Sequence, residues 1–134
     1  ALLFEDDGTL LAVARAGGKP AELCHAQPPY TEWTRVELDR HIGGPLLTKW
    51  GDHYLVGGRK QMGGARPVTS LYELIGNELQ EIAELPSGGD NSYPGFVALS
   101  ATEGLLSFYS SHEGSGTGLA PSAIYLATLS LDEA

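Results

Sequence analysis

The sequence predicts an all-β domain, and three observations lead to that prediction. The 134 residues include 18 glycines and 8 prolines, which favour short elements separated by frequent turns. Hydrophobic residues make up 42% of the chain, as in globular proteins with a sizeable core. Similar strand-turn-strand segments also recur along the chain, at spacings of roughly 40–50 residues.

The first round of this pattern lies in residues 1–41. A strong turn, EDDG, separates two apolar runs, and the loop GGKP follows the second run. A proline-rich loop then precedes WTRVEL, in which apolar and polar residues alternate clearly. The strands expected in this round are 1–4, 9–16, 21–26 and 33–38.

The second round has the same order of strands and turns, with strands expected at 45–50, 53–59, 68–74 and 79–85. The segment 71–85 also fits one apolar face of a helix. Gly76 and Asn77 lie in its middle, where they would cost a helix about 1 kcal/mol or more. The match with the other rounds therefore favours a hairpin over a helix.

The third round contains the most unusual local chemistry, in the stretch PSGGDNSYPGFVALSATEGLLSFYSSHE. This stretch, 86–113, reads as loop, strand, tight turn, strand and polar loop. Because a turn joins the two strands at one end, Asp90–Tyr93 and Ser110–Glu113 should emerge together at the other end. A further strand is expected at 123–129, and no fourth strand is evident after Leu131.

The three rounds predict three four-stranded antiparallel blades of a β-propeller, at about 1–41, 42–86 and 87–134, within a single domain. Propellers typically have four to eight blades, so three blades cannot close a ring alone. We expect half of a six-bladed propeller, completed by a second copy as a homodimer with two-fold symmetry. Upstream blades in a longer chain, a three-blade fragment and a small β-sandwich are the alternatives.

The charge of the chain excludes some partners. A net charge of −9 and a pI near 4.7 argue against binding to nucleic acid or to an anionic membrane surface. No apolar run approaches the roughly 20 residues of a membrane-spanning helix. The single cysteine, Cys24, is expected to be a small buried hydrophobic residue, and it leaves the compartment open.

Neither a cofactor nor a metal is expected. No G-x-G-x-x-G motif leads from a strand into a helix, so the sequence contains no dinucleotide-binding signature. His25, His41, His53 and His112 are scattered over different strands and loops, which does not fit the ligand spacing of a zinc site.

The ends of the predicted strands supply the candidate binding residues. Arg15 and Arg59 occupy matching places after buried strands, where an arginine can clamp a carboxylate through two parallel hydrogen bonds. The alternative is that each arginine pairs with one of the 17 acidic residues for structural reasons.

The polar ends of the third hairpin supply the candidate catalytic residues. Tyr93 would need a neighbouring base to act as a nucleophile, because the unperturbed pKa of tyrosine is near 10. Glu113 could be that base if the hairpin ends meet, and Asp90 and His112 could share the site. The alternative is that Tyr93 packs and anchors a loop, while the other residues shape turns or face solvent.

The segments DDGTLLAVAR, IGGPLL…YLVGGR, GGDNSYPGFVAL, LLSFYSSHEG and AIYLATL resemble the sialidase-like (neuraminidase-type) β-propellers, over nearly the whole chain, as the C-terminal half. The resemblance implies a six-bladed fold and an exo-glycosidase that holds the substrate carboxylate with arginines. Such enzymes use a tyrosine nucleophile assisted by a glutamate, with an aspartate as acid/base. It implies substrate-binding roles for Arg15 and Arg59, and it matches Tyr93 loosely to the nucleophile. Asp90, Ser110, His112 and Glu113 would be polar residues of a carbohydrate-facing pocket.

The sequence departs from that family at three places. The aspartate-box motif S-x-D-x-G-x-T-W is missing, and PPYTEWTRVEL, with Trp33 and Thr34, stands where it would end. Ser110 stands where a third arginine would be expected, and the family's acid/base would have to be replaced by Asp6 or Asp7. The expectation is therefore a propeller half with glycoside hydrolase activity or, alternatively, a non-catalytic sugar-binding or self-assembling module.

Overall fold

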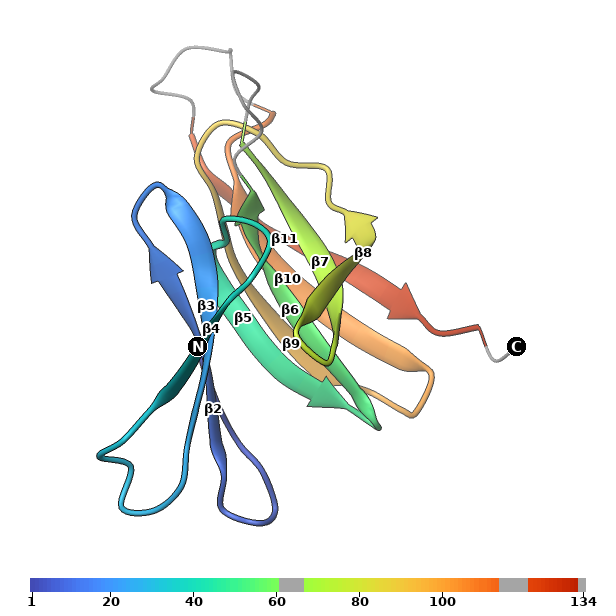
Figure 1. Cartoon of the computed structure of the whole chain (residues 1–134). Helices are drawn as coiled ribbons and strands as arrows, with labels where there is room; N and C mark the ends of the chain where they lie inside the picture. The colour runs from blue at the N-terminus through green and yellow to red at the C-terminus, as the bar shows by residue number, and fades with distance from the viewer. Residues whose placement is uncertain (61–66, 114–120, 133–134) are drawn as a thin grey trace.

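The computed structural model describes residues 1–60, 67–113 and 121–132, and these form an all-β structure without a helix (Figure 1). Each strand expected from the sequence is present, with ends that shift by a few residues. The strands are β1 (Leu2–Phe4), β2 (Leu10–Ala16), β3 (Lys19–Ala26), β4 (Thr34–Glu37), β5 (Gly43–Trp50), β6 (His53–Lys60), β7 (Val68–Ile75), β8 (Glu78–Glu84), β9 (Asn91–Ala98), β10 (Glu103–Ser110) and β11 (Ala123–Ser130).

The strands form three antiparallel sheets in chain order: sheet 1 (β1–β4), sheet 2 (β5–β8) and sheet 3 (β9–β11). The first two sheets have the predicted four strands. Sheet 3 has three in the described part of the chain, so the prediction of three four-stranded blades is wrong for the last sheet. Three sheets of this kind do not by themselves close a ring.

The segment that could have been a helix is the β7–β8 hairpin, which confirms the preferred interpretation. Ile75 pairs with Glu78 across the turn, and Gly76 adopts a φ of 62°, a value that suits glycine in a tight turn. Its apolar residues face two sides of the sheet, not one side of a helix.

Sheet 2 is the middle layer of the molecule, because each of its faces is covered by a neighbouring sheet. On one face, Leu47, Val56 and Tyr72 share a buried cluster with Val13 and Leu23 of sheet 1. On the other face, the cluster contains residues of sheets 2 and 3: Leu46, Leu71, Ala83, Phe96, Leu106, Phe108, Tyr125, Ala127 and Leu129. The three sheets are therefore stacked in chain order, and sheets 1 and 3 each keep one outer face.

Tyr72 places a phenol in the first of these clusters. Its side chain is fully buried, and its hydroxyl has no hydrogen-bond partner among the residues described. The Arg40 guanidinium lies 4.8 Å from the ring centroid, so it contacts the ring face. Burial raises the pKa of the Tyr72 phenol above its ordinary value, which keeps the hydroxyl protonated.

Tyr72→Phe is expected to raise the free energy of unfolding at neutral pH by about 1 kcal/mol, because it removes a buried and unpaired hydroxyl. The raised pKa also has a pH consequence. Because the folded pKa lies above the unfolded one, the free energy of unfolding of the wild type does not depend on this group below pH about 10, where the phenol is protonated in both states. It falls as the pH rises from there through the folded pKa, because only the unfolded phenol ionises readily. Urea unfolding at pH 8 and pH 11 should show a smaller alkaline loss in the variant than in the wild type. Equal alkaline losses in the two proteins would contradict this.

No helix in the described residues could cross a membrane.

Candidate functional site

The register of the third hairpin brings its two polar ends together, as expected. β9 pairs with β10 so that Ser92 lies opposite Tyr109 and Asn91 lies opposite Ser110. The pairing shifts register between Ser107 and Tyr109, which marks a bulge. β9 begins at Asn91, so Asn91 and Ser92, expected to precede the strand, belong to it.

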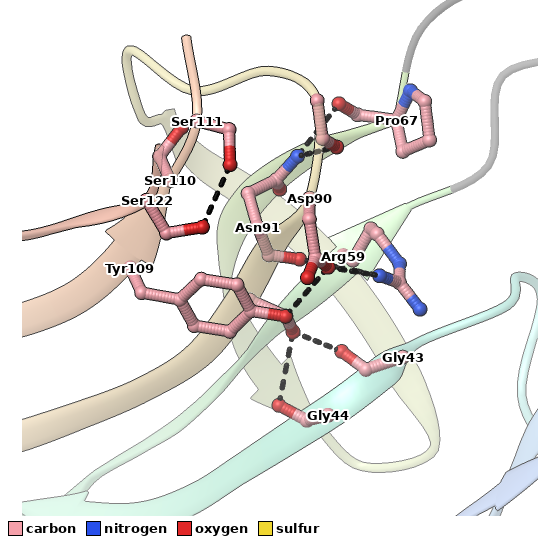
Figure 2. A network of polar contacts seen from close by, with 12 residues as sticks. Gly43, Gly44, Arg59, Pro67, Asp90, Asn91, Tyr109, Ser110, Ser111 and Ser122 are labelled. Atoms are coloured by element: carbon pink, nitrogen blue, oxygen red, sulfur yellow. Dashed lines mark hydrogen bonds and ion pairs between the residues drawn. The ribbon is translucent and has the colours of Figure 1, made fainter. Parts of the chain in front are cut away.

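A cluster of four side chains forms at this end, and we call it the Arg59 cluster: Arg59, Asp90, Tyr93 and Tyr109. Arg59 Nη1 lies 3.5 Å from Asp90 Oδ1 and 3.4 Å from the carbonyl oxygen of Asn91. The Tyr109 hydroxyl donates a hydrogen bond of 2.7 Å to the same Asp90 oxygen. Figure 2 shows Asp90 between the two donors, Arg59 from sheet 2 and Tyr109 from sheet 3.

Tyr93 adds an exposed aromatic ring to the cluster. Its ring is nearly parallel to that of Tyr109, with the centroids 6.0 Å apart and an interplanar angle of 20°, and its side chain is 67% exposed. Its backbone has a φ of 50°, a left-handed conformation that few non-glycine residues adopt. Strained backbone of this kind tends to occur at functional sites, where surrounding structure holds it in place.

Ser92, the residue before Tyr93, holds this backbone conformation in place. Ser92 is buried, and its hydroxyl donates hydrogen bonds to the carbonyl oxygens of Gly43 and Gly44 at the start of β5 (Figure 2). A Cβ atom on Gly44 would lie 2.6 Å from Ser92 Oγ and 3.2 Å from Tyr93 Cδ1. The absence of a side chain at Gly44 therefore lets sheet 3 approach sheet 2 closely beside the cluster.

Asn91 anchors the other side of the cluster. Its side chain is fully buried; Nδ2 donates to the carbonyl oxygens of Pro67 and Gly89, both at 3.0 Å, and Oδ1 accepts a 2.6 Å hydrogen bond from the Thr69 hydroxyl. One amide thus connects the first residues of β9 to β7 and to the loop before β9.

The electrostatics of the cluster keep Tyr109 a hydrogen-bond donor and hold the Arg59 guanidinium in place. Burial and then the adjacent Asp90 carboxylate raise the pKa of the Tyr109 phenol, so Tyr109 remains a hydrogen-bond donor at neutral pH. Asp90 is exposed, with 67% of its side chain accessible, whereas Arg59 is mostly covered at 21%. The guanidinium is therefore held in place, and its carboxylate partner has room to turn toward solvent.

The other site residues predicted for the hairpin, Ser110, His112 and Glu113, lie on the opposite face of sheet 3 from Tyr109. Phe108 and Tyr109 are consecutive in β10 and point to opposite faces, and Tyr125 stacks on Phe108. The Tyr125 hydroxyl donates a 2.9 Å hydrogen bond to Glu113 Oε2, and the His112 ring lies 4.7 Å from the Tyr125 ring. Burial and then this carboxylate raise the pKa of the Tyr125 phenol.

The contact expected between Glu113 and Tyr93 is therefore not formed, because the sheet lies between their faces. Ser110 is fully buried, accepts a 3.0 Å hydrogen bond from the Gly88 amide, and lies 2.8 Å from His112 Nδ1. Ser110 thus shapes the loop and is not accessible to a ligand. The structure brings together Arg59, Asp90 and Tyr93, and it separates them from Ser110, His112 and Glu113.

Arg15 is the penultimate residue of β2, and Arg59 is the penultimate residue of β6. Arg15 is exposed, and it takes no part in the hydrogen bonds and the ion pair that join the Arg59 cluster in the described residues. The acidic residues considered as replacements for the acid/base lie at the β1–β2 turn, at the opposite end of β2 from Arg15. There Asp7 accepts a hydrogen bond of 2.9 Å from the Thr9 amide, which lowers the pKa of its carboxyl.

Tyr109, not Ser110, occupies the position in β10 that corresponds to Arg15 in β2 and Arg59 in β6. The penultimate residue of β10 is Tyr109, and it points to the same side of its sheet as Arg59 does in sheet 2. Alignment of the three strand-turn-strand segments placed Ser110 at that position, and in the structure Ser110 is one residue beyond it. Alternation of the buried residues Leu106 and Phe108 was the signal that could have identified Tyr109.

No three histidine, cysteine, aspartate or glutamate side chains in the described ranges are grouped closely enough to hold a metal ion. No protein-family model matches the sequence, and no curated protein is significantly similar to it.

Proposed function

We propose that the chain is a sialidase-like β-propeller half that binds an acidic carbohydrate at the Arg59 cluster. The observation that carries the proposal is the exposed Tyr93 ring, held in a left-handed backbone conformation beside an anchored guanidinium. An aromatic face takes the apolar face of a sugar ring, and nearby polar groups fix its orientation.

The Arg59 side chain supports a preference for an acidic sugar. Its contact with Asp90 is a single 3.5 Å approach through Nη1, longer than a charge-assisted hydrogen bond between well-paired groups. A carboxylate that meets the guanidinium edge-on would make two parallel hydrogen bonds instead. Asp90 is exposed enough to turn away and to accept hydrogen bonds from sugar hydroxyls.

Binding is tested with a pair of variants that each remove one cation. Arg59→Ala is expected to raise the dissociation constant for a sialic acid-containing oligosaccharide about 30-fold, the effect of losing charge-assisted hydrogen bonds. Lys49→Ala removes an exposed cation at the opposite end of β5 from Gly44, outside the cluster, and should leave binding unchanged. Tyr93→Ala should weaken binding about 10-fold through loss of the stacking ring.

The measurement is isothermal titration calorimetry with acidic and neutral oligosaccharides in parallel. Equal affinity of the wild type and Arg59→Ala for the acidic sugar would rule out the carboxylate clamp. Failure of the wild type to bind any glycan of a broad array would rule out the carbohydrate-binding function itself.

Glycoside hydrolysis is the second candidate, because the exposed Tyr93 and Asp90 lie in one cluster. In the described residues Tyr93 contacts another phenol and not a base, so binding without turnover is the better-supported function. Turnover of fluorogenic sialosides by the wild type and not by Tyr93→Phe would favour hydrolysis. Equal turnover by both proteins would show that Tyr93 is not the nucleophile.

A further inference from the structure

In the part of the chain that the structure describes, no other strand packs on the outer face of sheet 3, and five apolar side chains lie on that face. Alternation along the three strands places Val97, Leu105, Tyr109, Ile124 and Leu126 on this face, since Leu106 and Phe108 point into the core. Ile124 and Leu126 are 76% and 67% exposed. Contiguous exposed apolar groups of this kind mark interaction surfaces in soluble proteins.

The outer face of sheet 1, at the other end of the stack, is a groove with a floor of small side chains. Ala12, Ala14 and Cys24 form the floor, and Glu22, Arg35 and Trp33 form the walls of a cavity of about 280 Å³. Leu11, Val13 and Leu23 alternate with the floor residues and face sheet 2, so the groove points away from the rest of the molecule.

We propose that the outer face of sheet 3 docks on the outer face of sheet 1 of a second copy, so that two copies close a ring of six sheets. The repeated packing of sheets inside the chain indicates that a second copy is the partner of this face. Sheet 1 packs its inner face on sheet 2, and sheet 2 packs its opposite face on sheet 3. The free face of sheet 3 corresponds to the faces that sheets 1 and 2 already use against the next sheet.

The penultimate residues of the middle strands show that correspondence. Arg59 and Tyr109 each point to the side on which the next sheet lies or would lie, and in β2, where Arg15 lies at a bulge, Val13 points to that side. The free face of sheet 1 corresponds to the face of sheet 2 that packs against sheet 1. A head-to-tail contact between these two faces repeats a geometry that the chain contains twice, and such a contact forms a ring where its rotation closes and an open filament where it does not.

The shapes and charges of the two faces fit each other. Branched side chains project from sheet 3, and small residues leave a groove in sheet 1. The chain carries a net charge of −9, so two copies repel each other at most surfaces. The two charged walls of the groove, Glu22 and Arg35, lie 3.9 Å apart and neutralise each other, and Val97, Leu105, Tyr109, Ile124 and Leu126 are uncharged.

The experiment is sedimentation velocity and light scattering of the 134-residue chain across a dilution series. We expect a particle of twice the 14.2 kDa monomer mass. Leu126→Glu on sheet 3 and Ala14→Glu in the groove should each raise the dissociation constant at least about 30-fold, the effect of losing one interface hot spot. Ile75→Glu, at the exposed β7–β8 turn, makes the same kind of change elsewhere and should leave the dimer intact.

Each other outcome overturns the proposal. A monomeric wild type shows that a second copy is not the occupant, and a polymer that grows with concentration shows that the contact does not close. Loss of the dimer in Leu126→Glu but not in Ala14→Glu means that two sheet 3 faces meet each other. Far-ultraviolet circular dichroism of each variant verifies the fold, and none of these readouts depends on sugar binding.

Discussion

Asn91→Leu is expected to lower the free energy of unfolding by about 4 kcal/mol. The substitution removes one buried hydrogen bond, to Thr69, and two partly buried ones, to Pro67 and Gly89, at a side chain with no solvent exposure. Leucine is similar in size, so the loss comes from buried polar groups without partners and not from a cavity. Each such group costs about 1–3 kcal/mol, which places this change among the large effects of single substitutions.

Urea unfolding measures the loss, and Asn77→Leu is the matched control. Asn77 lies at the exposed turn between β7 and β8, so its replacement should change the free energy of unfolding by at most about 0.5 kcal/mol. Similar losses in the two variants would show that the Asn91 network does not stabilise the fold.

Gly44→Ala is expected to cost about 3 kcal/mol of stability and to weaken binding at the Arg59 cluster. The φ of Gly44 is 58°, where a Cβ costs about 1–2 kcal/mol. The added methyl group would also lie 2.6 Å from Ser92 Oγ and 3.1 Å from Ser92 Cβ, which forces β9 away from β5. Overpacking of this kind adds about 1–3 kcal/mol.

Gly17→Ala provides the comparison, because a Cβ there would meet no atom within 4 Å and the backbone is not left-handed. We expect Gly17→Ala to be neutral or slightly stabilising. Thermal unfolding of both variants gives the stability difference, and calorimetry with the acidic oligosaccharide reports the site. If Gly44→Ala is as stable as the wild type and binds equally well, close approach of β5 and β9 does not position Tyr93.

Both predictions concern residues that hold the first three residues of β9 in their unusual backbone conformation. Asn91 and Ser92 use buried side chains to tie β9 to sheet 2, and Tyr93 follows with a left-handed backbone. The buried contacts on either side thus stabilise the strained residue, which fits a surface that must be rigid before a ligand arrives.

The sequence by itself determined the class of the fold and the position of every strand found in the described residues. Apolar runs bounded by glycine turns predict strands directly, since alternation and turn chemistry are local properties. The Gly76-Asn77 pair and the match with the other rounds favoured the β7–β8 hairpin over a helix. The strand-turn-strand repeat likewise predicted sheets in chain order, and the three strands of the third sheet were evident in the sequence, although a complete blade was expected to have four.

Only the tertiary structure decided which polar residues meet. The side chains of a strand alternate between two faces, so a one-residue error in alignment moved the position that corresponds to Arg59 from Tyr109 to Ser110. The same alternation put Tyr125 on the face opposite Tyr109, and Glu113, beyond the end of β10, accepts a hydrogen bond from Tyr125 there and not from Tyr93. Arg59 meets Asp90 because two sheets pack together, and contacts between residues so distant in sequence depend on packing that no local pattern encodes.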